Sequence, residues 1–87
     1  MTREEQEREL QVLSDAEAFP KLRTFYSFKD DPELAATARR LGMEPVPHLI
    51  RISTAPSPGG PTINLMGINE SGRRRLRALR VQLAPKR

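Results

Sequence analysis

Arginine is the residue type in this sequence that is best suited to a binding function. Five arginines occur between residues 73 and 80, and four of them fall on one arc of a helical wheel beside a stripe of leucines. Guanidinium groups on one helix face can contact successive phosphates, and each contact adds to the salt dependence of binding. The candidate nucleic-acid-binding residues are that arc and three earlier arginines: Arg73, Arg74, Arg77, Arg80, Arg39, Arg40 and Arg51.

The charge of the chain is distributed unevenly along its length. The 15 lysines and arginines and the 11 acidic residues give a net charge of +4. Residues 1–18 hold two arginines and six acids, whereas residues 48–87 hold eight basic residues and one glutamate. This asymmetry indicates a C-terminal half that faces a polyanion. Two other interpretations stay open: the arginines are solvated or pair with the acidic N-terminal segment, or they bind an acidic protein partner.

Few residues are suited to catalysis or metal binding. The chain has no cysteine, which excludes a disulfide scaffold, a thiolate zinc site and cysteine catalysis. The single histidine, His48, has no serine or acidic partner in a recognised motif, and we expect it to pack or cap at the start of a strand. Asp30, Asp31 and Glu33 are spaced for helix capping rather than for a cation, and phosphate-loop and nucleophile-elbow motifs are absent. We therefore expect no enzyme, no metal and no cofactor.

The length of 87 residues predicts a single domain over residues 1–87. Leucine, isoleucine, valine and phenylalanine make up 20 residues, so a folded monomer is feasible but marginal. We expect the leucines of the last helix to be exposed, which makes a homodimer possible. No segment reaches the length of a membrane span, and the polar N-terminus is unlike a signal peptide, so we expect a cytoplasmic protein with no membrane partner.

The first third of the chain predicts a helix followed by an extended segment. Residues 1–18 form an acidic N-terminal helix, because residues 2–5 match a capping box and strong helix formers follow. A second match at residues 14–17 could start a new turn. Residues 22–28 read as a short strand, and we favour a core position for Phe25, Tyr26 and Phe28 over base stacking.

The middle of the chain contains one clear helix and one ambiguous segment. Asp31 is suited to cap a helix, Pro32 to occupy its first position, and Gly42 to end it in a left-handed conformation. Residues 44–53 could hold a short proline-led helix. The alternating apolar residues within 48–54 favour a strand instead.

The remaining residues predict a β-hairpin and a final helix. Residues 55–61 are rich in proline and glycine and separate two strand-like runs, the second over residues 62–68. The hairpin tip carries no lysine or arginine, so contact with DNA and contact with a protein are equally open. Asn69 is a good N-cap for a helix that continues to about Leu83. The fold class is therefore α+β, in the order helix, strand, helix, β-hairpin, helix.

Two segments resemble a winged helix-turn-helix domain. The run LAATARRLG at residues 34–42 is similar to the first helix and turn of such a unit, with small alanines where helices cross and a glycine in the turn. The run PGGPTINLMGINESGRRRLRAL at residues 58–79 is similar to the wing and following helix of MarR- and PadR-like regulators. The resemblance covers residues 31–83 and implies a small winged-helix-like domain that binds double-stranded DNA and regulates transcription or replication. The family places a recognition helix soon after the turn, and a strand there would leave no helix for the major groove.

A second functional class remains open beside DNA binding. The chain could be a non-enzymatic protein-binding module, such as an accessory factor or inhibitor of the phage or plasmid type. In that case the hairpin and the aromatic segment would dock on a larger partner.

Overall fold

The computed structural model describes residues 2–44 and 46–84 and shows a small α+β domain, as the sequence predicts. Three helices and three strands are present in this part of the chain. Their order is α1 (Arg3–Glu17), β1 (Phe25–Ser27), α2 (Pro32–Met43), β2 (Ile50–Ala55), β3 (Thr62–Ile68) and α3 (Glu70–Gln82). No helix among these residues is long and apolar enough to cross a membrane.

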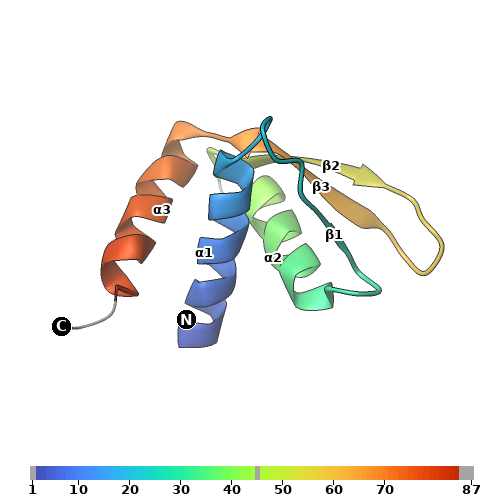
Figure 1. Cartoon of the computed structure of the whole chain (residues 1–87), viewed down its shortest axis with the longest axis horizontal. Coiled ribbons are helices and arrows are strands. Elements are labelled where there is room, and N and C mark those ends of the chain that lie inside the picture. Colours follow the sequence, from blue (N-terminus) through green and yellow to red (C-terminus); the bar gives the residue numbers. More distant parts are fainter. Residues whose placement is uncertain (1, 45, 85–87) are drawn as a thin grey trace.

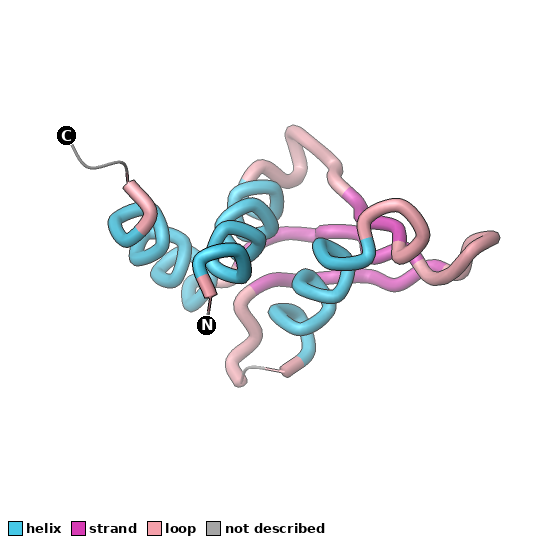
Figure 2. Tube along the Cα trace, turned by 90° about the horizontal axis from the view of Figure 1, so that it is seen from below, coloured by secondary structure: helices cyan, strands magenta, loops and turns pink. Residues whose placement is uncertain are grey.

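The strands form an antiparallel sheet in the order β1-β3-β2. All three helices lie on the same side of this sheet (Figure 1), with α1 and α2 over the strands and α3 beyond their end (Figure 2). The β2–β3 hairpin projects past α2, and the domain measures 44 Å along its longest axis against 26 and 23 Å along the others. No helix of the described residues covers the other face of the sheet, which carries the exposed side chains of Phe25 and Met66.

The core lies between the helices and the covered face of the sheet. Alternation along β3 turns Ile63 and Leu65 inward, where both are buried. The helices complete the core with small and branched apolar side chains, all of them buried: Val12, Leu13, Ala16, Ala35, Ala38, Leu41, Leu76 and Leu79. Because Leu76 and Leu79 are fully enclosed here, the expectation that the leucines of the last helix are exposed for dimerisation is wrong.

The segment between α2 and β2 decides how far the winged-helix expectation holds. Residues 46–49 form bends rather than a helix, and β2 begins at Ile50, so the strand interpretation is correct from that residue onward. Two backbone hydrogen bonds fix the segment, since the Leu49 N–H donates to the Leu41 carbonyl and the Asn69 N–H donates to the Leu49 carbonyl. No recognition helix exists among the described residues here; Pro45 lies outside them. His48 is exposed, so the expectation that it packs is wrong.

All three helices begin directly after their predicted N-cap residues, but only Thr2 forms a capping hydrogen bond with its side chain. The Thr2 side chain accepts a hydrogen bond from the Glu5 N–H at 3.1 Å, and α1 then continues without interruption through the second capping-box match. Helix α2 starts at Pro32, as predicted. It does not end at Gly42 in a left-handed conformation; that expectation is wrong, because Gly42 is helical and packs against Ile52.

The aromatic segment splits between core and surface. Tyr26 is buried and Phe28 is half-buried against the core, as expected, but Phe25 is 62% exposed and its expected core position is wrong. The reason is the alternation of side chains in β1, which allows only Tyr26 to face the helices.

Candidate nucleic-acid interface

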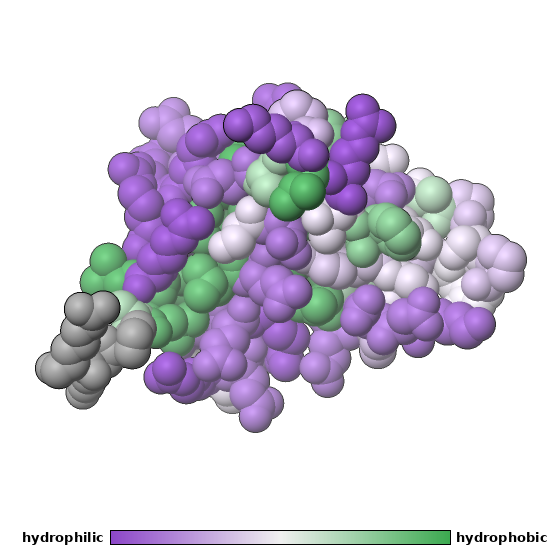
Figure 3. Space-filling model, viewed as in Figure 1, coloured by the Kyte–Doolittle hydropathy of each residue, from purple (hydrophilic) through white to green (hydrophobic). Residues whose placement is uncertain are grey.

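Helix α3 has two faces with different roles. One face holds Gly72, Leu76 and Leu79, which are buried where α3 packs against α1 and the segment before β2. Gly72 permits this approach, since a Cβ at that position would lie 2.1 Å from the Leu49 carbonyl oxygen. The helix period of 3.6 residues then turns Arg73 and its neighbours on the wheel away from the core. The hydrophilic surface that covers the upper part of α3 is visible in Figure 3.

The buried carboxylate of Glu9 forms ion pairs with two arginines, Arg40 and Arg75. Glu9 on α1 is only 2% exposed, and its two oxygens accept from Arg40 Nη2 on α2 and from Arg75 Nε on α3, each at 3.2 Å. The ion pairs replace the water that the carboxylate loses on burial. Arg40, a candidate nucleic-acid ligand from the sequence, therefore joins helices inside the domain.

A second acid of α1 neutralises one end of the arginine arc. Arg80 Nη2 lies 3.3 Å from Glu17 Oε1, with both side chains partly exposed. The interpretation that the acidic helix pairs with arginines of the last helix is thus confirmed for Arg80, and it applies to Arg75 as well. Arg40 pairs with the same helix although the interpretation did not extend to it.

Three members of the arc remain free to contact an anion. Arg73, Arg74 and Arg77 are exposed, and their side chains form no ion pair or hydrogen bond within residues 2–44 and 46–84. Their charges point to solvent from the first two turns of α3. We call these three residues together with Arg51 the arginine face.

Arg51 belongs to the arginine face because of a hydrogen bond at the helix start. Its Nε donates to Asn69 Oδ1 at 3.2 Å, and Asn69 Nδ2 donates to the His48 carbonyl at 2.9 Å. Asn69 directly precedes α3, so the exposed guanidinium of Arg51 is held beside the first turn of that helix. Asn69 occupies the predicted N-cap position, but its side chain performs this positioning task and makes no capping hydrogen bond.

Arg39 lies apart from the other candidates. It projects from α2 into a hollow beneath the β2–β3 hairpin, together with Phe28 and Met43. The structure therefore brings together four of the seven predicted arginines, uses two internally and places one elsewhere.

Sequence reasoning missed the buried role of Glu9, although a signal was present. Glu9 shares the spacing of the buried stripe on α1, since Val12, Leu13 and Ala16 follow it at intervals of three, four and seven residues. An acid on the apolar stripe of a helix requires a basic partner from another element.

A second buried polar contact links β1 to α1. The Tyr26 hydroxyl donates a hydrogen bond to the Asp15 carboxylate. Burial raises the pKa of Tyr26 above its usual value, and the hydrogen bond and the negative charges of Asp15 and Asp31 add to the effect. The phenol is therefore held in its neutral, donating form, which suits a structural contact rather than a catalytic one.

Metal ligation has no support in the described part of the chain, where no group of three or more histidine, cysteine or acidic side chains converges. Comparison of the chain with protein-family models, with characterised proteins and with solved structures finds no match. The function proposed below therefore rests on the arginine face and on the hollow beneath the hairpin.

Proposed function

We propose that this protein binds nucleic acid through the arginine face, as a small DNA-binding protein that acts in transcription or replication. The observation that carries the proposal is the uneven use of the arginines. Glu9 and Glu17 of α1 form ion pairs with Arg40, Arg75 and Arg80. Arg73, Arg74 and Arg77 stay exposed on α3, and Arg51 is exposed beside its first turn. Four guanidiniums held on one surface are suited to bind successive phosphates.

The element order supports a winged-helix-like reading of this domain, with one restriction. Apart from the recognition helix, which the described residues lack, a helix, a strand, a second helix, a projecting hairpin and a final helix follow one another as in that family. The bends at residues 46–49 provide no helix for the major groove. We therefore expect binding to double-stranded DNA through its backbone, with little preference for sequence.

The salt dependence of binding tests this function. Four phosphate contacts predict that log K falls with log salt with a slope of about −3.6, which is about 150-fold weaker binding at 200 mM than at 50 mM salt. Fluorescence anisotropy with a labelled duplex measures both quantities. Replacing Arg73, Arg74 and Arg77 together by glutamine leaves one contact and a slope of about −0.9.

The matched control is Arg3→Gln, which removes an exposed arginine from α1, outside the arginine face. It is expected to leave the slope unchanged. Absence of binding at 50 mM salt, or a triple variant with an unaltered slope, contradicts the proposal.

A second candidate function is a non-enzymatic protein-binding module. The hollow beneath the hairpin favours it, because the aromatic segment and the hairpin both contribute to its walls. A pull-down with the full chain that returns one protein in stoichiometric amount would support this function.

A further inference from the structure

A groove runs beneath the hairpin on the side of α2. One part has a volume of about 620 Å³ and extends along α2 from Phe28 to Glu44. The adjoining part, about 440 Å³, is closed by Thr54, Pro61 and Ile63 of the hairpin. Phe28, Arg39 and Met43 line both parts, so the two lie next to each other, and we call them together the hairpin groove.

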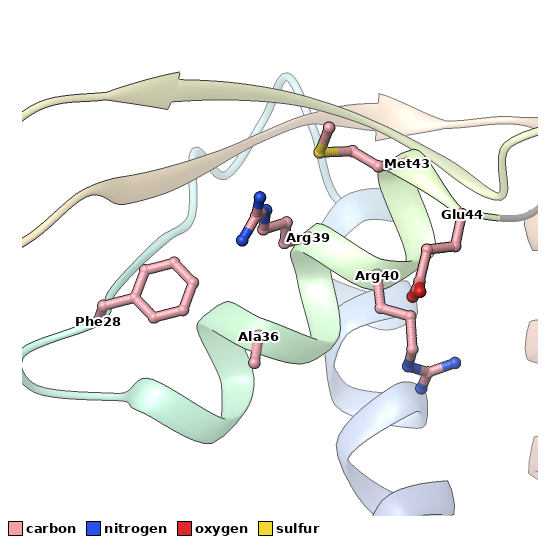
Figure 4. A pocket seen from close by; sticks show the side chains of 6 residues that line it. All are labelled: Phe28, Ala36, Arg39, Arg40, Met43 and Glu44. Atoms are coloured by element: carbon pink, nitrogen blue, oxygen red, sulfur yellow. The ribbon is translucent and has the colours of Figure 1, made fainter.

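The groove exists because the hairpin is longer than the helix that supports it. The strands continue past α2, so the inner face of the hairpin has no helix over it there (Figure 1). Met43 is 55% exposed, although Figure 4 shows it at the end of α2 that lies against the sheet. An exposed methionine beside a phenylalanine is typical of a surface that buries an apolar side chain from a partner.

Charge distinguishes the two ends of the groove. Arg39 has no ion pair or hydrogen bond to its side chain within the described residues, and Figure 4 shows it directed toward Phe28 and the sheet. Arg40 lines the other end, where its guanidinium pairs with Glu9. Glu44 also lies at that end, and Figure 4 shows its carboxylate turned away from Arg39. An incoming acid is thus attracted at the Phe28 end and repelled at the Glu44 end.

We propose that the hairpin groove binds a segment of a partner protein in which a bulky apolar side chain stands next to an aspartate or glutamate. The apolar side chain packs between Phe28 and Met43, and the carboxylate accepts hydrogen bonds from the guanidinium of Arg39. Arginine can bind a carboxylate with two parallel hydrogen bonds, which fixes its position as well as its charge. This inference rests on the second candidate function and is independent of the arginine face.

Short peptides test the chemistry of the groove directly. The probes are hexapeptides in which phenylalanine or leucine is flanked by aspartate or glutamate, and matched hexapeptides with asparagine or glutamine instead. They are titrated into the full-length, isotope-labelled chain and followed by NMR. We expect the Met43 methyl signal to shift while that of Met66, which lines a different hollow, stays in place. The amide-containing peptides are expected to bind at least about tenfold more weakly.

Reversing the charge at Arg39 tests whether the peptide binds in the hairpin groove or at another site. Arg39→Glu is expected to lose the acidic peptide and to prefer the same peptide with lysine, whereas Arg3→Gln, outside both the groove and the arginine face, is expected to bind as the original chain does. Shifts at Met66 or on α3 alone overturn the groove but leave a protein-binding function standing. Equal binding of acidic and amide peptides, or no shift at Met43 with any peptide, overturns the proposal. A Met43 shift that depends on protein concentration indicates that a second copy of the chain occupies the groove. A Met43 shift that requires a DNA oligonucleotide indicates that nucleic acid is involved. Either result overturns the proposal.

Discussion

Replacing Glu9 by glutamine tests how the three helices are held together. The side chain keeps its size, but the charge that binds Arg40 and Arg75 is lost. An amide oxygen can still accept one hydrogen bond, whereas its NH₂ group faces a guanidinium that can only donate. The substitution therefore removes one charge-assisted contact and weakens the other, without creating a cavity.

The expected cost follows from how far each partner is exposed. Breaking a fully buried ion pair costs about 3–5 kcal/mol, because one charge is left without water or a counterion. Here Glu9 is 2% exposed, but the side chains of Arg40 and Arg75 are 41% and 31% exposed and can regain water. We expect a loss of about 2 kcal/mol, close to the contribution of one hydrogen bond to a charged group. With an m-value of about 1 kcal/mol/M, the urea midpoint falls by about 2 M.

Urea unfolding followed by circular dichroism measures this change. The matched control is Glu7→Gln, two residues away on the same helix, whose partner Arg3 is 70% exposed. An exposed pair of this kind contributes less than about 0.5 kcal/mol. If Glu9→Gln costs no more than Glu7→Gln, the ion pairs of Glu9 do not hold the helices together and the reasoning is refuted. The double variant Glu9→Gln/Arg40→Gln should cost less than the sum of its parts.

Three further predictions concern the core. Since the folded state raises the pKa of Tyr26, the free energy of unfolding should fall above about pH 10, the usual value of tyrosine, by up to about 1.4 kcal/mol per pH unit. Tyr26→Phe should remove that part of the pH dependence, and phenolate absorbance reports the group directly because it is the single tyrosine. Gly72→Ala should lower the free energy of unfolding by more than about 2 kcal/mol, because the Cβ of alanine would meet the Leu49 carbonyl oxygen. This loss outweighs the higher helix propensity of alanine. A variant more stable than the original chain would disprove the close contact. Leu79→Ala should cost about 2–5 kcal/mol in thermal or urea unfolding and Val81→Ala less than about 0.5, since their exposed fractions are 0% and 78%; equal costs would contradict the packing of α3.

Signals that act over a few residues were sufficient for much of the fold. The Asp31-Pro32 pair marks the start of α2 because proline needs no hydrogen-bond acceptor in a first turn. Ile63 and Leu65 mark the inner face of β3 because side chains alternate along a strand. These features depend on local backbone geometry, which the sequence encodes directly.

Features that depend on contacts between distant elements could not be predicted in the same way. Gly42 is a frequent helix terminator, yet here it continues α2 because the side chain of Ile52 packs where a Cβ would stand. Arg77 and Arg80 share one arc of the helical wheel, and only the position of α1 decides that Arg80 meets Glu17 while Arg77 meets solvent. The sequence identified the arginine-rich helix as the candidate site but could not divide it into paired and available charges.

The contact between α1 and α3 also bears on how the domain forms. Glu9 and Arg75 are 66 residues apart in the sequence, so their ion pair closes a loop that contains the whole sheet and α2. Closing a loop of this length lowers the conformational entropy of the chain before the stabilising contacts have formed. Contacts between residues so far apart in the sequence therefore slow folding. Until α3 docks, Leu13 and its neighbours on α1 lack part of their cover. We therefore expect the docking of α3 on α1, and with it the ion pair between Arg75 and Glu9, to be a late step in folding.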